Sequence, residues 1–141
     1  MTINPYLIFN GTCEEAFLFY QSVFGGEIPY MGKFKDMPSD GQPELSEKDA
    51  NKIMHVSLPI GNGTIIMGSD SNTASGDVKI GDNVSISIDT DSSEEADKLF
   101  NGLSAGGNIK MPLQKTFWGA YFGMFEDKFG IHWMINFDEK K

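Results

Sequence analysis

Two histidines, His55 and His132, are the residues of this chain best suited to acid–base or metal chemistry. Each lies in an apolar stretch whose residues alternate as they do in a strand, IMHVSL and IHWMINF. Imidazole titrates near neutral pH and binds metal ions, so either residue could transfer a proton or coordinate an unconventional metal. The simpler interpretation, which we favour, is that both are hydrogen-bonded strand residues in a partly hydrated cavity.

Strand alternation predicts which side chains share a face with these histidines. The residues predicted to face a helix are Met54, Val56, Leu58, Val84, Ile86, Ile88, Ile131, Trp133, Ile135 and Phe137. Those predicted to face a cavity are Ile53, His55, Ser57, Ile65, Met67, Asn83, Ser85, Ser87, Phe122, Met124, His132, Met134 and Asn136. Polar groups among soft apolar walls suit a small amphipathic ligand. We therefore predict as ligand-binding residues His55, Ser57, Met67, Ser85, Ser87, Trp118, Phe122 and Met134. The segment FWGAY places Trp118 as either a stacking lid or a turn-packing aromatic.

Other reactive patterns are weak. Cys13 is expected in a first helical turn, where a helix dipole could lower a thiol pKa. With no histidine near it in the sequence, a small buried residue is the better interpretation. The chain has no Walker loop and no strand-turn-helix GxGxxG, so no phosphate or dinucleotide cofactor is expected.

The elements that must position these residues occur twice along the chain. TCEEAFLFYQSVFGGEI begins at Thr12 and SSEEADKLFNGLSAGGNI begins at Ser92. Both open like a capping box, Thr12 with Glu15 and Ser92 with Glu95. Both then place apolar residues at helical spacing, which predicts that Phe19, Tyr20, Leu99 and Phe100 are buried. Both end in a glycine pair suited to a left-handed helix end.

Strands are predicted around both helices. Their expected ranges are 3–9, 28–34, 52–59 and 64–69 in the first half, and 83–89, 109–115, 120–126 and 131–137 in the second. The fold class is therefore α+β, with two tandem βαβββ modules forming curved mixed sheets around a concave cavity. We expect one domain, 1–141, with module one at 1–69, a linker at 70–82 and module two at 83–141. The segment Lys35–Asn51 has no counterpart and is expected to be a surface loop or a lid.

Composition limits the partners. The net charge is −9, and all eleven basic residues are Lys, which makes nucleic acid an unlikely partner. A single cysteine excludes an internal disulfide and fits a reducing, cytoplasmic location. The N-terminal residues lack a basic region followed by a long apolar stretch, so neither secretion nor membrane insertion is expected.

Three stretches of the chain carry a family resemblance, namely NPYLIFNGTCEEAFLFYQSVFGGEI, KIMHVSLPIGNGTIIMGSD and FWGAYFGMFEDKFGIHWMINF. They resemble the vicinal oxygen chelate superfamily of glyoxalases, bleomycin-resistance proteins and dioxygenases, and within it the PhnB-like group. The resemblance implies metal ligands on the first and last strand of each module. The matching residues here are Pro5, Met67, Asn83 and Met134, which are poor donors for hard divalent ions. We therefore expect no metal and no cofactor.

Three functions remain open. The first is metal-free binding of a drug or metabolite. The second is a lyase, an isomerase or an unconventional metalloenzyme that uses His55 or His132. The third and least favoured is the methyltransferase implied by a common label of the group, because no S-adenosylmethionine loop is recognisable. The resemblance and the apolar residues Phe17, Leu18 and Phe24 also predict a homodimer formed through helix Cys13–Phe24.

Overall fold

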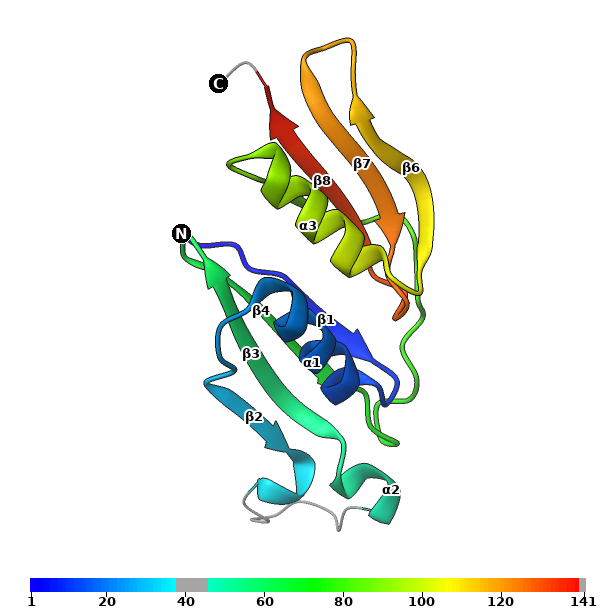
Figure 1. The fold of residues 1–141 in the computed structure, drawn as a ribbon. Coiled ribbons are helices and arrows are strands. Elements are labelled where there is room, and N and C mark those ends of the chain that lie inside the picture. The colour runs from blue at the N-terminus through cyan, green and yellow to red at the C-terminus, as the bar shows by residue number, and fades with distance from the viewer. Residues whose placement is uncertain (38–45, 140–141) are drawn as a thin grey trace. The chain divides into compact units, whose positions relative to one another are not determined.

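The computed structural model describes residues 1–37 and 46–139. The chain divides into two compact units, Met1–Lys79 and Ile80–Lys141. Each unit contains a sheet with a long helix against one of its faces (Figure 1). The two units are described one at a time.

The first unit has a four-stranded mixed sheet in the order β1-β4-β3-β2. Its elements are β1 (Tyr6–Phe9), α1 (Cys13–Phe24), β2 (Tyr30–Lys33), the 3-10 helix η1 (Phe34–Asp36), α2 (Glu47–Ala50), β3 (Ile53–Gly61) and β4 (Thr64–Asp70). β1 pairs with β4 in parallel, whereas β2–β3 and β3–β4 are antiparallel. Helix α1 is therefore part of the crossover from β1 to its parallel partner β4, which is the last strand of the unit.

The second unit repeats this arrangement, with the order β5-β8-β7-β6. Its elements are β5 (Ile86–Asp89), α3 (Ser93–Ser104), β6 (Asn108–Lys115), β7 (Ala120–Glu126) and β8 (His132–Asp138). β5 is parallel to β8, and the other pairs are antiparallel. The predicted α+β fold with two tandem βαβββ modules is confirmed.

In the first unit, α1 packs on the face of the sheet that carries Val56, Leu58 and Ile66, all fully buried. Phe17 lies over Gly68, where an added Cβ would stand 2.6 Å from its ring. At the corresponding places of the second module the chain has Asp97 and Ile135. The Phe17–Gly68 pair is thus a size match specific to the first unit.

In the second unit, α3 packs in the same way on the face that carries Trp133 and Ile135. Phe100 lies over Gly123 and meets Phe125 edge-on, with ring centroids 5.0 Å apart.

The predicted burial of Tyr20, Leu99 and Phe100 is confirmed. Phe19 was predicted to be buried as well, but it is only half-buried.

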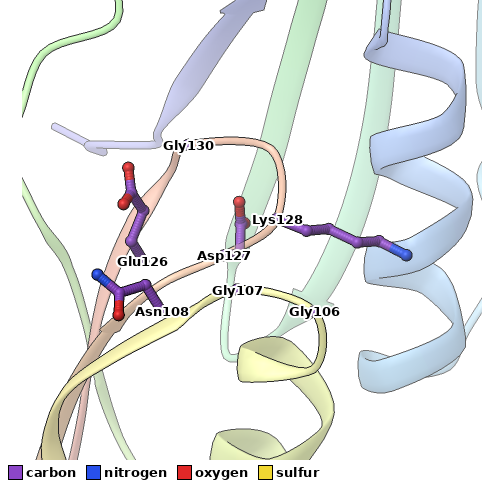
Figure 2. A pocket seen from close by; sticks show the side chains of 7 residues that line it. All are labelled: Gly106, Gly107, Asn108, Glu126, Asp127, Lys128 and Gly130. Carbon is purple, nitrogen blue, oxygen red and sulfur yellow. The ribbon is translucent and has the colours of Figure 1, made fainter.

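The β7–β8 turn lies against the end of α3 (Figure 2). A Cβ at Gly107 would collide with the carbonyl oxygen of Glu126, so only glycine permits this approach. Asp127 holds the turn, since its carboxylate accepts from the backbone N–H groups of Phe129 and Ile131 and from Trp133 Nε1. The buried indole thus has the hydrogen-bond partner that its burial requires.

The two helices begin differently. Ser92 caps α3 as predicted, because its hydroxyl accepts from Glu95 N at 3.1 Å and the Glu95 side chain accepts from Asp91 N. The predicted cap at Thr12 is wrong, since its side chain makes no capping hydrogen bond to the described residues.

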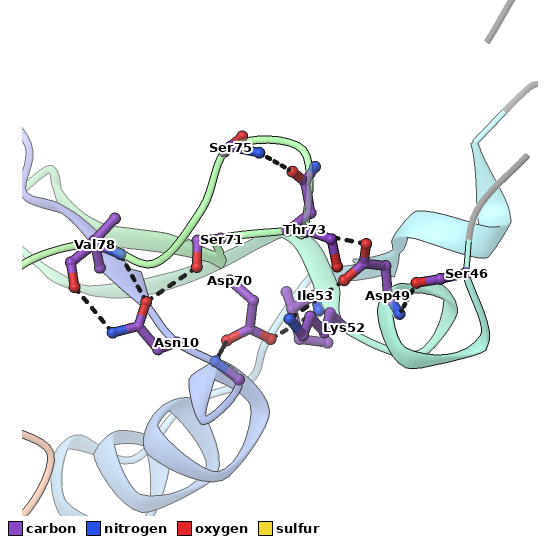
Figure 3. Close-up of polar contacts among 12 residues, drawn as sticks. Asn10, Ser46, Asp49, Lys52, Ile53, Asp70, Ser71, Thr73, Ser75 and Val78 are labelled. Carbon is purple, nitrogen blue, oxygen red and sulfur yellow. Dashed lines mark hydrogen bonds and ion pairs between the residues drawn. The ribbon is translucent and has the colours of Figure 1, made fainter. Parts of the chain in front are cut away.

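Asp70, at the end of β4, takes the place of that cap (Figure 3). Its Oδ1 accepts from Gly11 N and Cys13 N, both at 2.9 Å, and its Oδ2 accepts from Ile53 N at 3.0 Å. One buried carboxylate therefore joins the start of α1 to strands β3 and β4. A residue 57 positions away in the sequence performs the function that a local hydroxyl performs in α3.

Helix α2 is joined to the chain after β4 by Asp49 (Figure 3). Its Oδ2 accepts from Thr73 N at 3.0 Å, and Lys52 Nζ lies 3.3 Å from Oδ1. The hydrogen bonds from Thr73, and then Lys52, hold the pKa of Asp49 below its ordinary value. The predicted loop Lys35–Asn51 thus includes η1 and α2, and its residues 38–45 lie outside the described ranges.

Two predictions of alternation are wrong. Val84 was assigned to a core-facing strand position, but β5 begins at Ile86 and Val84 is 73% exposed. Ile53 was assigned to a cavity, but it is buried. The β2–β3 register shifts between Gly32 and Lys33, so that Ile53 and His55 are opposite consecutive residues of β2. Such a bulge breaks the two-residue period on which the prediction relied.

Candidate functional site

In the first unit, four side chains, one from each strand, lie side by side across the sheet on the face opposite α1. The strand register pairs Tyr6 with Met67, Met67 with Ser57, and Ser57 with Tyr30. The adjacent positions Val56 and Gly68 face the helix, so these four side chains face away from it. Of the residues predicted from sequence, the structure brings His55, Ser57 and Met67 together on this surface.

His55 is the centre of this surface. Tyr6 Oη lies 3.2 Å from His55 Nδ1, which is a hydrogen bond between β1 and β3 across the intervening β4. When the phenol donates, the neutral imidazole carries its own proton on Nε2. Tyr30 flanks the opposite side of the ring, with centroids 6.0 Å apart. We call Tyr6, Tyr30 and His55 the aromatic row.

Sequence reasoning missed both tyrosines of the aromatic row. Tyr6 and Tyr30 are 45% and 48% exposed, which is unusual for such large rings on a sheet. Alternation could have placed Tyr6, since Phe9 at the end of β1 is buried and Tyr6 points the other way. Their contacts with His55 could not be predicted, because each tyrosine lies on a different strand from His55 and at a different level along the sheet.

The second unit contains the other predicted ligand-binding residues, of which Ser87, Phe122 and Met134 lie on its sheet. Met134 pairs with Ser87 on one side and Met124 on the other. Trp118, in the β6–β7 turn, lies edge-on to Phe122 with ring centroids 6.3 Å apart. Ser85 is exposed and precedes β5, so the sheet does not fix its direction.

His132 is in a different setting from His55. It is buried, and its Nε2 lies 3.7 Å from a carboxylate oxygen of Glu126, its partner across the strands. His55, by contrast, is half-buried. The burial of His132 therefore leaves His55 as the more accessible candidate.

A shallow depression of about 380 Å³ lies at the β7–β8 turn of the second unit (Figure 2). Its lining residues are Gly106, Gly107, Asn108, Glu126, Asp127, Lys128 and Gly130. None of them was predicted to bind ligand. Asp127 already accepts two hydrogen bonds from its own turn and one from Trp133, so the depression is best explained by turn geometry.

Cys13 is unsuited to nucleophilic chemistry. It is fully buried, and its desolvation, followed by the charges of Asp70 and Glu14, raises the pKa of its thiol. A thiol held protonated near neutral pH is a poor nucleophile. The interpretation of Cys13 as a buried structural residue agrees with this environment.

Within residues 1–37 and 46–139, no three His, Cys, Asp or Glu side chains are grouped so that they could hold a metal ion. No helix in those ranges is long and apolar enough to cross a membrane.

Comparison with known proteins extends over nearly the whole chain. Residues 1–136 match the family described as 3-demethylubiquinone-9 3-methyltransferase. Protein YjdN of Escherichia coli is 36% identical, with 96% of this chain and 95% of that protein covered. The crystal structure of protein PA1353 from Pseudomonas aeruginosa is 43% identical, with 98% of both chains covered and a TM-score of 0.86.

More distant structures share the fold. A PhnB protein from Bacillus cereus is 27% identical, with 97% of this chain and 99% of that chain covered and a TM-score of 0.73. A glyoxylase/bleomycin resistance protein/dioxygenase domain from Frankia is 14% identical, with 98% and 97% covered and a TM-score of 0.65. The last of these structures shares only the fold with this chain. The chain itself belongs to the 3-demethylubiquinone-9 3-methyltransferase family, the PhnB-like group.

Proposed function

We propose that this protein binds a small amphipathic molecule on the helix-free sheet face of its first unit. The observation that carries the proposal is the Tyr6–His55 hydrogen bond on an open face flanked by Tyr30. It combines exposed aromatic surface with oriented polar groups, the mixture typical of small-molecule sites. Ser57 and Met67 would supply a hydroxyl and a polarisable wall beside the ring.

The second-unit residues Ser85, Ser87, Trp118, Phe122 and Met134 stay predicted ligand-binding residues. The exposed Trp118 of the β6–β7 turn and the half-buried Phe122 of β7 form an aromatic pair, which would suit an apolar part of a ligand. Because this surface offers fewer oriented polar groups than the aromatic row, we assign the first unit the main role.

Native mass spectrometry of protein purified without added ligand tests the proposal first, by revealing any co-purified small molecule. A panel of small phenols, indoles and quinolines, followed through labelled histidine and methionine signals, then locates the surface. Binding should be lost in His55→Ala and kept in the matched second-unit variant Phe122→Ala. If Phe122→Ala abolishes binding and His55→Ala does not, the site belongs to the second unit.

A second candidate function is an enzyme, a lyase or isomerase, in which His55 transfers a proton. The Tyr6 hydrogen bond favours it, because a bond at Nδ1 orients the imidazole and leaves Nε2 without a bond to the described residues. Any reaction found in a substrate screen should disappear in His55→Ala. In Tyr6→Phe it should persist with a shifted pH–rate profile. A pH–rate profile unchanged in Tyr6→Phe would argue against this function.

The proposed binder works without a metal ion. We expect purified protein to carry no stoichiometric zinc, iron, manganese or nickel, and its melting temperature to be unchanged by chelator. Pro5, Met67, Asn83 and Met134, which stand where the superfamily resemblance implies ligands, are poor donors for hard cations. About one tightly held ion per chain, lost in the His55→Ala/His132→Ala variant, would support the unconventional metalloenzyme instead.

Methyl transfer, which the family description names, is the least favoured function. The chain has no glycine-rich loop after a first parallel strand of the kind that holds S-adenosylmethionine in doubly wound folds. A methyl-transfer assay with S-adenosylmethionine, together with analysis of bound cofactor, tests it directly.

A further inference from the structure

The aromatic row is oriented differently from the aromatic pairs of the core. The core pairs Phe9–Phe17, Phe17–Tyr20 and Phe100–Phe125 meet edge-on, at 87°, 76° and 81°. In the aromatic row, by contrast, His55 is tilted only 33° from Tyr6 and 37° from Tyr30. The row is also solvent-exposed, with both tyrosines nearly half accessible. Two exposed tyrosine rings and the half-buried imidazole between them, all shallowly tilted, offer a platform on which a flat molecule can stack.

Gly32 determines where one end of this platform lies. It is the register partner of His55, and it lies two residues after Tyr30 on the same face of β2. A Cβ at Gly32 would be 2.7 Å from Tyr30 Cζ and in direct collision with the hydroxyl. The phenol ring therefore leans along the strand over the bare backbone of Gly32, which brings it beside His55. Any larger residue would push the ring away from the platform.

One polar atom of the platform is available to a ligand. Tyr6 occupies His55 Nδ1, and within residues 1–37 and 46–139 no protein group bonds to His55 Nε2. With Tyr6 donating, Nε2 is a hydrogen-bond donor on a half-buried ring. A ligand that stacks on the row can thus pair a carbonyl, hydroxyl or ring nitrogen with this group.

We propose that the ligand is a planar aromatic or heteroaromatic molecule that stacks on Tyr6, His55 and Tyr30 and accepts a hydrogen bond from His55 Nε2. This inference rests on the proposed function, since it names the ligand class of the same surface. Gly32 is a positioning residue that acts only through Tyr30. Stacking on an aromatic side chain typically contributes enough free energy that its loss weakens binding roughly tenfold.

The test compares two probes that share a hydroxyl and a carbon skeleton, flat naphthol and its saturated, puckered analogue decahydronaphthol. The chain has two histidines, so labelling at histidine Cε1 gives one signal from the site and one from His132 as an internal control. Naphthol should shift the His55 signal and leave the His132 signal in place. It should also bind at least about tenfold more tightly than decahydronaphthol.

Variants then test the role of Gly32. Tyr30→Ala and Gly32→Ala should each weaken naphthol binding by a similar factor. The double variant should bind no more weakly than Tyr30→Ala alone, because the glycine acts through the tyrosine. Gly32 does not have a positive φ, so the alanine adds no backbone strain, and an unchanged urea unfolding curve verifies that the variant folds.

The outcomes separate this inference from the proposed function. Equal binding of the two probes at the His55 surface, or full affinity in Gly32→Ala, would overturn aromatic stacking while leaving a small-molecule site there. Absence of any His55 shift with either probe at millimolar concentration would overturn both. A shift confined to His132 would do the same and move binding to the second unit.

Discussion

Asp70 accepts hydrogen bonds from three backbone N–H groups, and those of Cys13 and Ile53 would otherwise be buried without a partner. We expect Asp70→Asn to destabilise the fold by about 3 kcal/mol, because the amide group must turn an N–H toward a backbone N–H and a charged acceptor is lost. Urea unfolding measures this. The matched control is Asp77→Asn, an exposed residue of the same unit, which should change stability little. Equal effects of both substitutions would show that the Asp70 hydrogen bonds contribute little.

The buried thiol of Cys13 leads to a second prediction, on how stability depends on pH. Its pKa is raised above the ordinary 9.0, so near that pH the folded state keeps a proton that the unfolded state releases. Its contribution to stability is therefore complete below about pH 9 and declines as pH rises above it. A thiol reagent should react with folded protein only slowly at neutral pH. Cys13→Ala should lose less stability than wild type between about pH 8 and pH 10.

At the scale of elements, the two long helices offer a matched pair of substitutions. Ser92→Ala removes a hydroxyl that caps α3 and should cost about 1 kcal/mol. Thr12→Ala, at the same place before α1, should cost much less, because Asp70 supplies the hydrogen bond there. Denaturant melts of the two variants decide the matter. A Thr12→Ala loss as large as that of Ser92→Ala would contradict the assignment of the cap to Asp70.

The two modules also differ in the contacts that their long helices make. Helix α1 carries Phe17 where α3 carries Asp97, and each finds a different partner. Phe17 fills the space left by Gly68, whereas Asp97 accepts a 2.6 Å hydrogen bond from the Tyr121 hydroxyl, whose pKa it raises. The repeated helical pattern therefore specified the same fold twice while the two helix faces were packed differently.

At the scale of the whole molecule, the homodimer stays a prediction. Phe17, one of the residues that suggested it, is buried within the first unit, so the exposed apolar residue of α1 is Leu18, at 50%. If α1 forms the interface, Leu18→Glu should dissociate the dimer, since a charge would be buried there. Sedimentation at micromolar concentration measures this. Lys98→Glu, at the corresponding place on α3, is the control.

Two results would contradict the predicted interface. A wild-type monomer at micromolar concentration would remove the dimer altogether. A Leu18→Glu protein that stays dimeric would place the interface on another surface.

The sequence by itself determined the repeated βαβββ order and most buried positions. Those features depend on local periods, 3.6 residues for a helix and two for a strand, which can be read without knowing the partners. Val56 and Trp133 were assigned correctly for that reason. Where the period was interrupted, as at the bulge before His55, the assignment of Ile53 failed.

Only the tertiary structure decided which residues meet. The cap of α1 comes from Asp70 on another strand, and the partner of His55 is Tyr6, 49 residues away on a strand that is not its neighbour. Tyr30 reaches His55 because Gly32 leaves the backbone bare, a feature of side-chain direction rather than of sequence period. Long-range contacts depend on strand order and on the space left by small residues, and neither is encoded within one local stretch of chain.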